Sequence, residues 1–376
     1  MRIYLDSNAT TQPTPAVIAA VRSALETNWA NPSSLHRAGQ GARRIVELAR
    51  RQVAELLGAR TGEIIFTSGG TESIYMALRG VLDAAPGRAL VTSRIEHPAV
   101  IDLAQRLQRE GKEVRWIEVT GAGVIDLDCA RGLIDDGVAL VSVQWANNET
   151  GALQPVEQLR EMCRAAGCLL HTDATQAAGK EPVGAARADL LTLSAHKFHG
   201  PKGVGALYVR RGLNLAWPCP GSQELGRRAG TENVPAIAGL GAAAAEARAW
   251  LADDEARAQA RALRDEIEQR LCAIAGARVL GPPGAQRLWN TLCISFAGAA
   301  AEPLLMALSE RGVCISGGAA CASGAVEMSP VLRAMGVADE VGASAIRISL
   351  SRLTGREEAL AGAAAIAETV QNLRSA

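Results

Sequence analysis

Short apolar runs alternate with amphipathic segments over the first two thirds of the chain. Seven runs rich in aliphatic and β-branched residues predict strands, at 64–67, 89–92, 114–119, 139–143, 169–171, 190–193 and 205–209. Apolar positions at helical spacing between several of them predict helices over 72–79, 99–109 and 156–165. Continuous apolar strands separated by amphipathic helices are typical of a parallel sheet covered on both faces. We therefore expect an α/β domain built on a mostly parallel sheet.

The last third of the chain has a different pattern. An Ala-, Arg- and Glu-rich stretch over 236–274 predicts a long helical spine that joins two lobes, and Gly-Pro-Pro-Gly at 281–284 ends it. The elements predicted beyond it are strands at 291–296 and 345–350 and helices at 302–311, 330–335 and 356–373. We expect a large domain over 12–255 and a smaller C-terminal α/β domain over 256–376, with residues 1–11 packing near the small one.

Composition narrows the classes of partner. Of 376 residues, 48% are hydrophobic, and 39 basic residues balance 39 acidic ones, so no net charge draws the chain to nucleic acid or anionic lipid. No apolar run reaches the roughly 18 residues of a membrane span, and the first eleven residues lack the basic start and apolar core of a signal peptide. We expect a cytoplasmic protein without nucleic acid or membrane partners.

The cysteines and lysines suggest where chemistry could occur. Eight cysteines show no CxxC spacing, so we expect neither a disulfide framework nor a resident metal site. Only four of the 39 basic residues are lysines: Lys112, Lys180, Lys197 and Lys202. Arginine cannot supply an amine that loses its proton, so a chain rich in arginine retains lysine where such an amine is needed.

Lys197 follows the predicted strand 190–193, at the sheet edge where ligands bind in open α/β sheets. It is either an ordinary loop lysine or the amine that forms a Schiff base with a carbonyl cofactor. The second interpretation requires an anion site and a partner for the cofactor ring.

Candidates for both follow other predicted strands. The turn 68–73 opens a helix and could hold a phosphate, or it is a simple helix cap. Asp173 could pair with a protonated ring nitrogen, or it caps a turn. Amide side chains over 147–151 could donate to a phenolate or carboxylate oxygen, and His97 could stack on a ring, although a lone histidine is more often structural. Their joint occurrence on successive strand ends favours one site.

Several motifs resemble the pyridoxal-phosphate-dependent cysteine desulfurases of the NifS/IscS class, in the class V aminotransferase family. They lie in order over almost the whole chain, at 4–11, 31–36, 68–73, 96–98, 147–151, 171–180, 194–203, 223–224, 228–233 and 316–323. The contexts of Trp145 and of 227–234 are most similar to the nitrogen-fixation branch. The resemblance implies the fold type I of pyridoxal-phosphate-dependent transferases, with a mostly parallel seven-stranded sheet in the large domain.

The resemblance also implies roles for individual residues. Lys197 would bind pyridoxal 5'-phosphate covalently, Asp173 would pair with its ring nitrogen, and His97 would stack on the ring and help to move protons. The other cofactor-binding residues it implies are Gly70, Thr71, Asn148, Gln176, Ser194, Ala195, His196 and Thr231. Thr231 would come from the neighbouring subunit, which implies a homodimer with shared active sites. Asn148 and Arg347 would bind the substrate, with Arg347 on its carboxylate.

Cys321 decides the reaction that the resemblance implies. It lies in a loop of small residues over 316–324, without the apolar neighbours that a buried cysteine would have, and we expect this loop to be mobile. Its thiolate would take sulfur from L-cysteine as a persulfide, leaving L-alanine. The sulfur would pass to an iron–sulfur scaffold or another acceptor protein, and Cys321 could transiently ligate a cluster.

Other interpretations stay open on the sequence. A selenocysteine lyase or a desulfinase would share every cofactor residue, whereas an aminotransferase of the same fold would not need Cys321. A non-catalytic assembly scaffold would not need Lys197 and Asp173.

Overall fold

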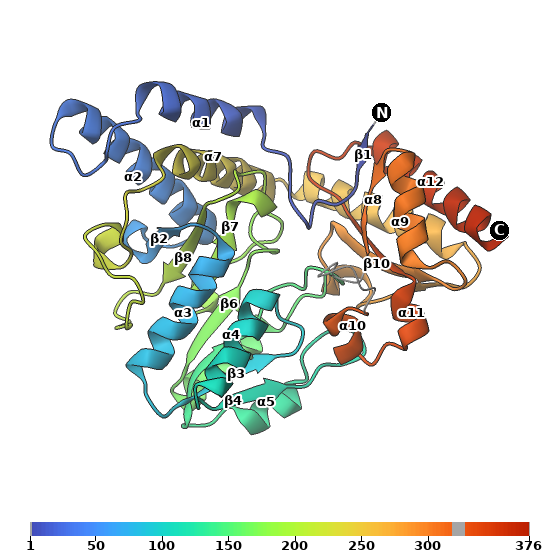
Figure 1. The fold of residues 1–376 in the computed structure, drawn as a ribbon, viewed down its shortest axis with the longest axis horizontal. Helices are drawn as coiled ribbons and strands as arrows, with labels where there is room; N and C mark the ends of the chain where they lie inside the picture. The colour runs from blue at the N-terminus through green and yellow to red at the C-terminus, as the bar shows by residue number, and fades with distance from the viewer. Residues whose placement is uncertain (1, 318–327, 376) are drawn as a thin grey trace.

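A computed structural model describes residues 2–317 and 328–375, and its largest element is a seven-stranded sheet (Figure 1). The strands, in spatial order, are β2 (Ile64–Thr67), β8 (Gly205–Val209), β7 (Leu190–Ser194), β6 (Leu169–Asp173), β5 (Val138–Ser142), β3 (Ala89–Ser93) and β4 (Val114–Ile117). Only β8 runs against its neighbours in this sheet. The predicted strands and the mostly parallel sheet are confirmed.

Helices cover both faces of the sheet, which explains why its strands are mostly apolar. Helices α3 (Gly70–Ala84) and α4 (Pro98–Arg109) pack on one face, in a core with Leu90 and Leu140. The other face carries α1 (Pro15–Thr27), α2 (Arg37–Leu57), α5 (Leu127–Leu133), α6 (Val156–Ala166) and α7 (Val234–Leu251). Because both faces of the sheet are buried, polar side chains can contact a ligand at the carboxyl ends of its strands.

The second lobe is smaller and has its own core. Its four-stranded sheet has the order β12 (Ser316–Gly317), β13 (Ala345–Ser349), β10 (Thr291–Phe296) and β9 (Ala277–Val279). The helices of this lobe are α8 (Asp254–Cys272), α9 (Ala301–Glu310), α10 (Pro330–Ala334), α11 (Asp339–Ala343) and α12 (Arg356–Ser375). Helices α8, α9 and α12 pack apolar side chains on β10 and β13, as the predicted α/β lobe requires.

The helical spine predicted over 236–274 consists of two helices. Helix α7 ends at Leu251, and the side chain of Asp253 caps the first turn of α8 by accepting from the backbone N–H of Ala256 at 2.9 Å. An aspartate before a helical segment is a common helix start. The predicted domain boundary at 255/256 stays a prediction.

The N-terminal segment joins the two lobes. Strand β1 (Ile3–Tyr4) pairs in parallel with β11 (Val313–Cys314), and Leu5 is buried in the core of the small lobe. A few residues later the backbone N–H of Thr11 donates to the carbonyl of His196 in the large lobe, at 2.9 Å. The residues between these contacts therefore cross the boundary between the lobes.

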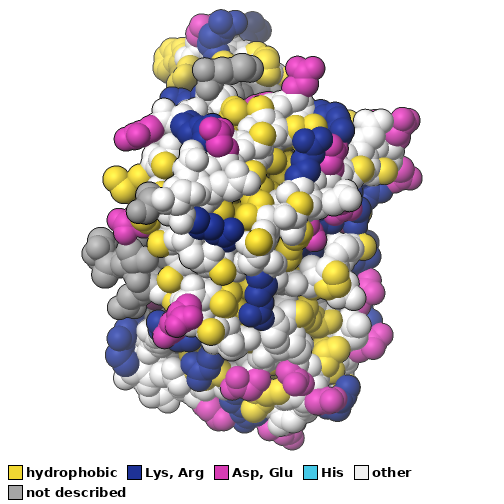
Figure 2. Space-filling view, turned by 90° about the vertical axis from the view of Figure 1, so that its right-hand side faces the viewer, with side chains coloured by type: hydrophobic (Ala, Val, Ile, Leu, Met, Phe, Trp, Pro, Cys, Tyr) yellow, Lys and Arg dark blue, Asp and Glu magenta, His cyan; other side chains and the backbone are white. Residues whose placement is uncertain are grey.

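Charged side chains of both signs are interspersed on the face shown in Figure 2, in keeping with the balanced composition. In the part of the chain that the structure describes, no helix has the length and apolar character to cross a membrane. Within the same residues, no group of three or more His, Cys, Asp or Glu side chains is arranged to hold a metal ion.

Candidate active site

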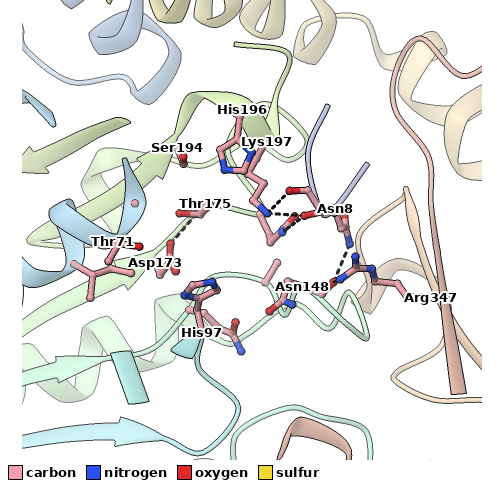
Figure 3. A pocket seen from close by; sticks show the side chains of 16 residues that line it. Asn8, Thr71, His97, Asn148, Asp173, Thr175, Ser194, His196, Lys197 and Arg347 are labelled. Carbon is pink, nitrogen blue, oxygen red and sulfur yellow. Dashed lines mark hydrogen bonds between the residues drawn. The ribbon is translucent and has the colours of Figure 1, made fainter. Parts of the chain in front are cut away.

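The carboxyl ends of the sheet strands and the small lobe enclose a pocket of about 370 Å³. The side chains or backbone of these residues line it: Asn8, Ala9, Gly70, Thr71, Ile74, His97, Gln144, Ala146, Asn148, Asp173, Thr175, Gln176, Ser194, His196, Lys197 and Arg347. In Figure 3, Thr71 and Asp173 lie on one side of Lys197, and Asn8, Asn148 and Arg347 lie on the other.

Lys197 ends a short 3-10 turn, η3 (Ala195–Lys197), that directly follows β7. Its Nζ donates to the backbone carbonyls of Asn8 at 2.6 Å and Ala9 at 3.0 Å. Burial, and secondarily the positive charge of Arg347, lower its pKa to about 8, although Asp173 and Asp6 act in the opposite direction. An amine with this pKa is uncharged in about one molecule in ten at pH 7, so it can react as a nucleophile or base.

Asp173 ends β6, and only 7% of its surface is exposed. Its Oδ1 accepts from the backbone N–H of Thr175 at 3.0 Å, which fixes the carboxylate at the base of the pocket. A buried carboxylate is costly unless a cation or donor faces it. Asp173 therefore suits a protonated ring nitrogen.

The N-terminus of α3 forms a cradle beside Asp173. A Cβ at Gly70 would lie 3.1 Å from Oγ1 of Thr175 and 3.7 Å from Cβ of Ser194, so a larger residue would fill the cradle. The first amides of a helix lack partners within the helix and attract anions. The buried hydroxyl of Thr175 also has no hydrogen-bond partner among the described residues. This end of the pocket is suited to a phosphate group.

Two imidazoles border the pocket, and burial lowers the pKa of both. His97 is the N-cap of α4, where its Nδ1 accepts from the backbone N–H of Ala99 at 3.1 Å. The pKa of His196 falls to about 4, with contributions from nearby lysines, and its Nδ1 lies 3.1 Å from Oγ1 of Thr10. Both rings are neutral at pH 7, so each can offer an N–H without adding charge.

Arg347 reaches the pocket from β13 of the small lobe. One guanidinium nitrogen donates to Oδ1 of Asp6 at 2.7 Å and another to the backbone carbonyl of Asn148 at 3.1 Å. Ser316 donates to the same Asp6 oxygen at 2.8 Å. The fixed fork of donors is suited to a substrate carboxylate, for which Asp6 is an internal competitor.

The structure brings most of the sequence-predicted residues together, with three exceptions. Ala195, the first residue of η3, is fully buried and does not line the pocket. Thr231 is exposed and lies outside the pocket lining. Cys321 lies outside the described residues, as do positions 318–324 of the expected loop 316–324, whose first two residues form β12.

Several residues that line the pocket were not predicted from the sequence, and Asn8 is the one with the most hydrogen bonds. Asn8 lies in the motif 4–11, but nothing in the local sequence indicates that its carbonyl accepts from both Lys197 and Gln176. Thr175 and Gln144 were also missed as individual residues. Their positions directly after strands 169–173 and 138–142 were the available signal.

The donors and acceptors of the pocket fit pyridoxal phosphate. The open cradle at Gly70 and the Thr175 hydroxyl, which has no partner in residues 2–317 and 328–375, are suited to its phosphate. Asp173 is suited to its ring nitrogen and Lys197 to its aldehyde. The volume left by these side chains is that of a typical small-molecule site.

Comparison with known proteins agrees with this chemistry. The family described as Aminotransferase class-V matches residues 3–361. A cysteine desulfurase of Cereibacter sphaeroides is 49% identical over 95% of this chain and 92% of its own length. Cysteine desulfurase 2 of Trichormus variabilis is 45% identical over 95% of this chain and 90% of its own. A solved structure titled NIFS-LIKE PROTEIN superposes with a TM-score of 0.92 at 36% identity, covering 99% of this chain and 100% of that one.

Family match, relatives and shared architecture agree over nearly the whole length of the chain. The α/β fold with its mostly parallel seven-stranded sheet is the fold type I of pyridoxal-phosphate-dependent transferases. The chain therefore belongs to the aminotransferase class-V family and is a pyridoxal-phosphate-dependent enzyme.

Proposed function

We propose that this enzyme is a cysteine desulfurase, which converts L-cysteine to L-alanine and holds the removed sulfur as a persulfide on Cys321. One observation carries the proposal: a titratable amine, a buried carboxylate and a carboxylate-binding guanidinium converge in one pocket, on Lys197, Asp173 and Arg347. The names of the relatives, cysteine desulfurase at 49% and 45% identity, support it.

Pyridoxal phosphate, when bound, supplies an electron sink for negative charge at the substrate α-carbon. Asp173 would hold the ring nitrogen protonated, and the amides at the start of α3, with Ser194 and His196, would bind the phosphate. His97 would cover the ring from the side of α4. Together these residues would hold the ring in a fixed orientation relative to the amine of Lys197.

Lys197 would move the proton. The carbonyls of Asn8 and Ala9 hold its amine within the pocket, and its pKa of about 8 leaves part of it free to accept a proton near neutral pH. As pH rises through 8, a larger fraction of the amine is uncharged.

Cys321 would perform the sulfur step as a thiolate. Its sulfur attacks the substrate sulfur, an S–S bond forms and the C–S bond of the substrate breaks. The electron pair of the broken bond stays with the substrate carbon, which takes a proton and becomes the methyl group of alanine. The products are L-alanine and a persulfide, so atoms and electrons balance without an external oxidant.

Arg347 would bind the carboxylate of cysteine, so we expect Arg347→Ala to raise KM for cysteine by about 10- to 100-fold, the loss expected for charged hydrogen bonds. Arg347→Ala also removes the ion-pair partner of Asp6. Arg347→Lys keeps a positive charge at this position, so its KM should lie between those of the unmodified protein and Arg347→Ala. The control is Arg311→Ala, an exposed arginine paired with Glu368 on the small lobe. Steady-state kinetics with an unchanged KM in both Arg347 variants would contradict the assignment.

A homodimer with shared active sites is part of the proposal. Arg228 pairs with Glu72 at 2.7 Å and buried Arg50 with Glu224 at 2.7 Å, which anchors the segment carrying exposed Thr231 to the large lobe. Trp29 is 76% exposed and Leu35 91% exposed, as in surfaces that a partner covers. A second subunit would use Thr231 to complete the neighbouring phosphate site, and sedimentation velocity tests this assembly.

The sulfur would leave on an acceptor protein, for which we propose an iron–sulfur assembly scaffold in the cytoplasm. Similarity to the nitrogen-fixation branch supports supply to nitrogenase clusters as one destination.

A direct assay tests the proposed function. The purified protein, loaded with pyridoxal phosphate and given L-cysteine, should form alanine and protein-bound sulfur in equal amounts in the first turnover, measured by amino-acid analysis and by release of sulfide with a thiol reductant. Parallel rates with selenocysteine distinguish a selenocysteine lyase. Transfer of the amino group to a 2-oxo acid without bound sulfur would instead identify an aminotransferase, and no bound cofactor would favour a scaffold.

A further inference from the structure

Lys180 is a buried amine for which the proposed chemistry has no role. It follows the turn after β6, and 5% of its surface is exposed. Its Nζ donates to Oε1 of Gln176 at 2.7 Å and to Oδ1 of Asn8 at 3.2 Å. Among the described residues, its hydrogen-bond partners are amide oxygens and not carboxylates. An amide oxygen can accept a hydrogen bond from a neutral amine and does not require the amine to be charged.

The surroundings of Lys180 oppose a positive charge. Burial and the charges of two neighbouring cations, Lys197 and Arg347, lower its pKa far below the usual value. An uncompensated buried charge costs more free energy than the loss of its proton.

Asn8, which accepts a hydrogen bond from Lys180, also forms hydrogen bonds with residues of both lobes. Its backbone carbonyl accepts from Lys197 at 2.6 Å, and its side-chain nitrogen donates to Thr291 of the small lobe at 2.9 Å. Its side-chain oxygen accepts from Lys180 and from Asn290, the latter at 3.0 Å. The side-chain contacts of Asn8 therefore help to fix the backbone carbonyl that, together with that of Ala9, accepts from Lys197.

The ability of lysine to lose its charge explains why position 180 holds lysine in a chain that mostly uses arginine. This chain has 35 arginines, obtained by subtracting its four lysines from 39 basic residues. Arginine remains charged in proteins. At position 180 it would add a permanent third cation beside Lys197 and Arg347, whereas lysine can donate hydrogen bonds without a charge.

We infer that Lys180 is a positioning residue, an uncharged hydrogen-bond donor that orients Asn8 and Gln176 and through Asn8 the reacting amine of Lys197. The inference rests on the proposed function only in that Lys197 is the reacting amine.

The charge of Lys180 can be tested without measuring catalysis, through its effect on the pKa of Lys197. The full-length protein, stripped of cofactor with hydroxylamine, is labelled with a trace of acetic anhydride over a range of pH, and peptide mass spectrometry follows Lys197. In the unmodified chain Lys197 should titrate at about 8. Lys180→Met should leave this pKa unchanged, because no charge is removed, and Lys180→Arg should lower it by about one unit through the added cation.

Matched controls are Lys112→Met and Lys112→Arg. Lys112 pairs with Asp83 and lies just before β4, at the amino end of that strand and outside the pocket. Neither variant should change the pKa of Lys197. A rise of about one unit in Lys180→Met would show that Lys180 is charged and would overturn the inference. So would an unchanged pKa in a folded Lys180→Arg. If the arginine variant does not fold, the methionine variant alone decides.

The positioning role is tested by turnover. Lys180→Met should lower kcat about tenfold with little change in KM. Introduced into Asn8→Ala, it should cause no further loss, because Lys180 acts through the side chain of Asn8. Losses that multiply would show that Lys180 acts independently of Asn8. If the chain forms no alanine from cysteine, the proposed function fails, and the labelling result still decides the charge of Lys180.

Discussion

Lys197→Ala should abolish the covalent attachment of pyridoxal phosphate and lower alanine formation from cysteine by at least about a thousandfold. The variant removes both the amine that would hold the cofactor and the base that would move the proton, and a single positioned acid–base group contributes about 10²- to 10⁴-fold to a rate. The effect is large because no other described lysine lines the pocket. Absorbance of the bound cofactor and alanine analysis measure the two losses.

A chemical experiment identifies the attached amine. Borohydride reduction followed by peptide mapping should place the pyridoxyl group on Lys197 in the unmodified protein and on no lysine in the variant. Lys112→Ala, at a lysine outside the pocket, should keep both cofactor and activity. A pyridoxyl group on Lys180, or full activity in Lys197→Ala, would refute the assignment.

Cys321→Ser should abolish the protein-bound persulfide while leaving the cofactor in place. A serine hydroxyl is a far weaker nucleophile than a thiolate toward sulfur, so we expect the rate of sulfur transfer to fall by at least about a hundredfold. The absorbance of the bound cofactor should stay unchanged, because none of the described residues that line the pocket is altered. Mass spectrometry for an added sulfur atom, together with alanine analysis, measures the result.

Cys219 provides the matched control for this experiment, since it is an exposed cysteine outside the pocket. Cys219→Ser should retain both persulfide and turnover. A persulfide that persists in Cys321→Ser on another cysteine, such as Cys219 or Cys314, would show that the sulfur acceptor was assigned to the wrong thiol. The same outcome would leave the cofactor chemistry at Lys197 intact.

The order of strands and helices was predictable because a sheet buried on both faces requires short apolar runs, which are visible in the sequence. The strands at 138–142 and 190–194 are mostly apolar, and each is followed by a segment that carries polar side chains. The same logic predicted that Lys197, Asp173 and Asn148 share one sheet edge, and all three line the pocket. The break between α7 and α8 was not predicted because alanine and arginine favour helix on both sides of it. Its one local signal is the capping side chain of Asp253.

The contacts of the N-terminal segment were beyond local pattern. The two strands Ile3–Tyr4 and Val313–Cys314 are each two residues long and have no recognisable periodicity. Arg347 was predicted as a substrate ligand, but its ion pair with Asp6 joins residues 341 positions apart. Such contacts depend on how the lobes close on each other, and no sequence window contains them.

The sequence by itself determined the sheet, the two lobes and the chemical types gathered at the strand ends, because those follow from apolar periodicity and from residues adjacent to each strand. Tertiary structure decided the electrostatic state of the site: burial beside Arg347 lowers the pKa of Lys197, and Lys180 is placed against Asn8 and Gln176. The physical reason is that the cost of a charge depends on its distance from solvent and from other charges, which only the folded chain fixes.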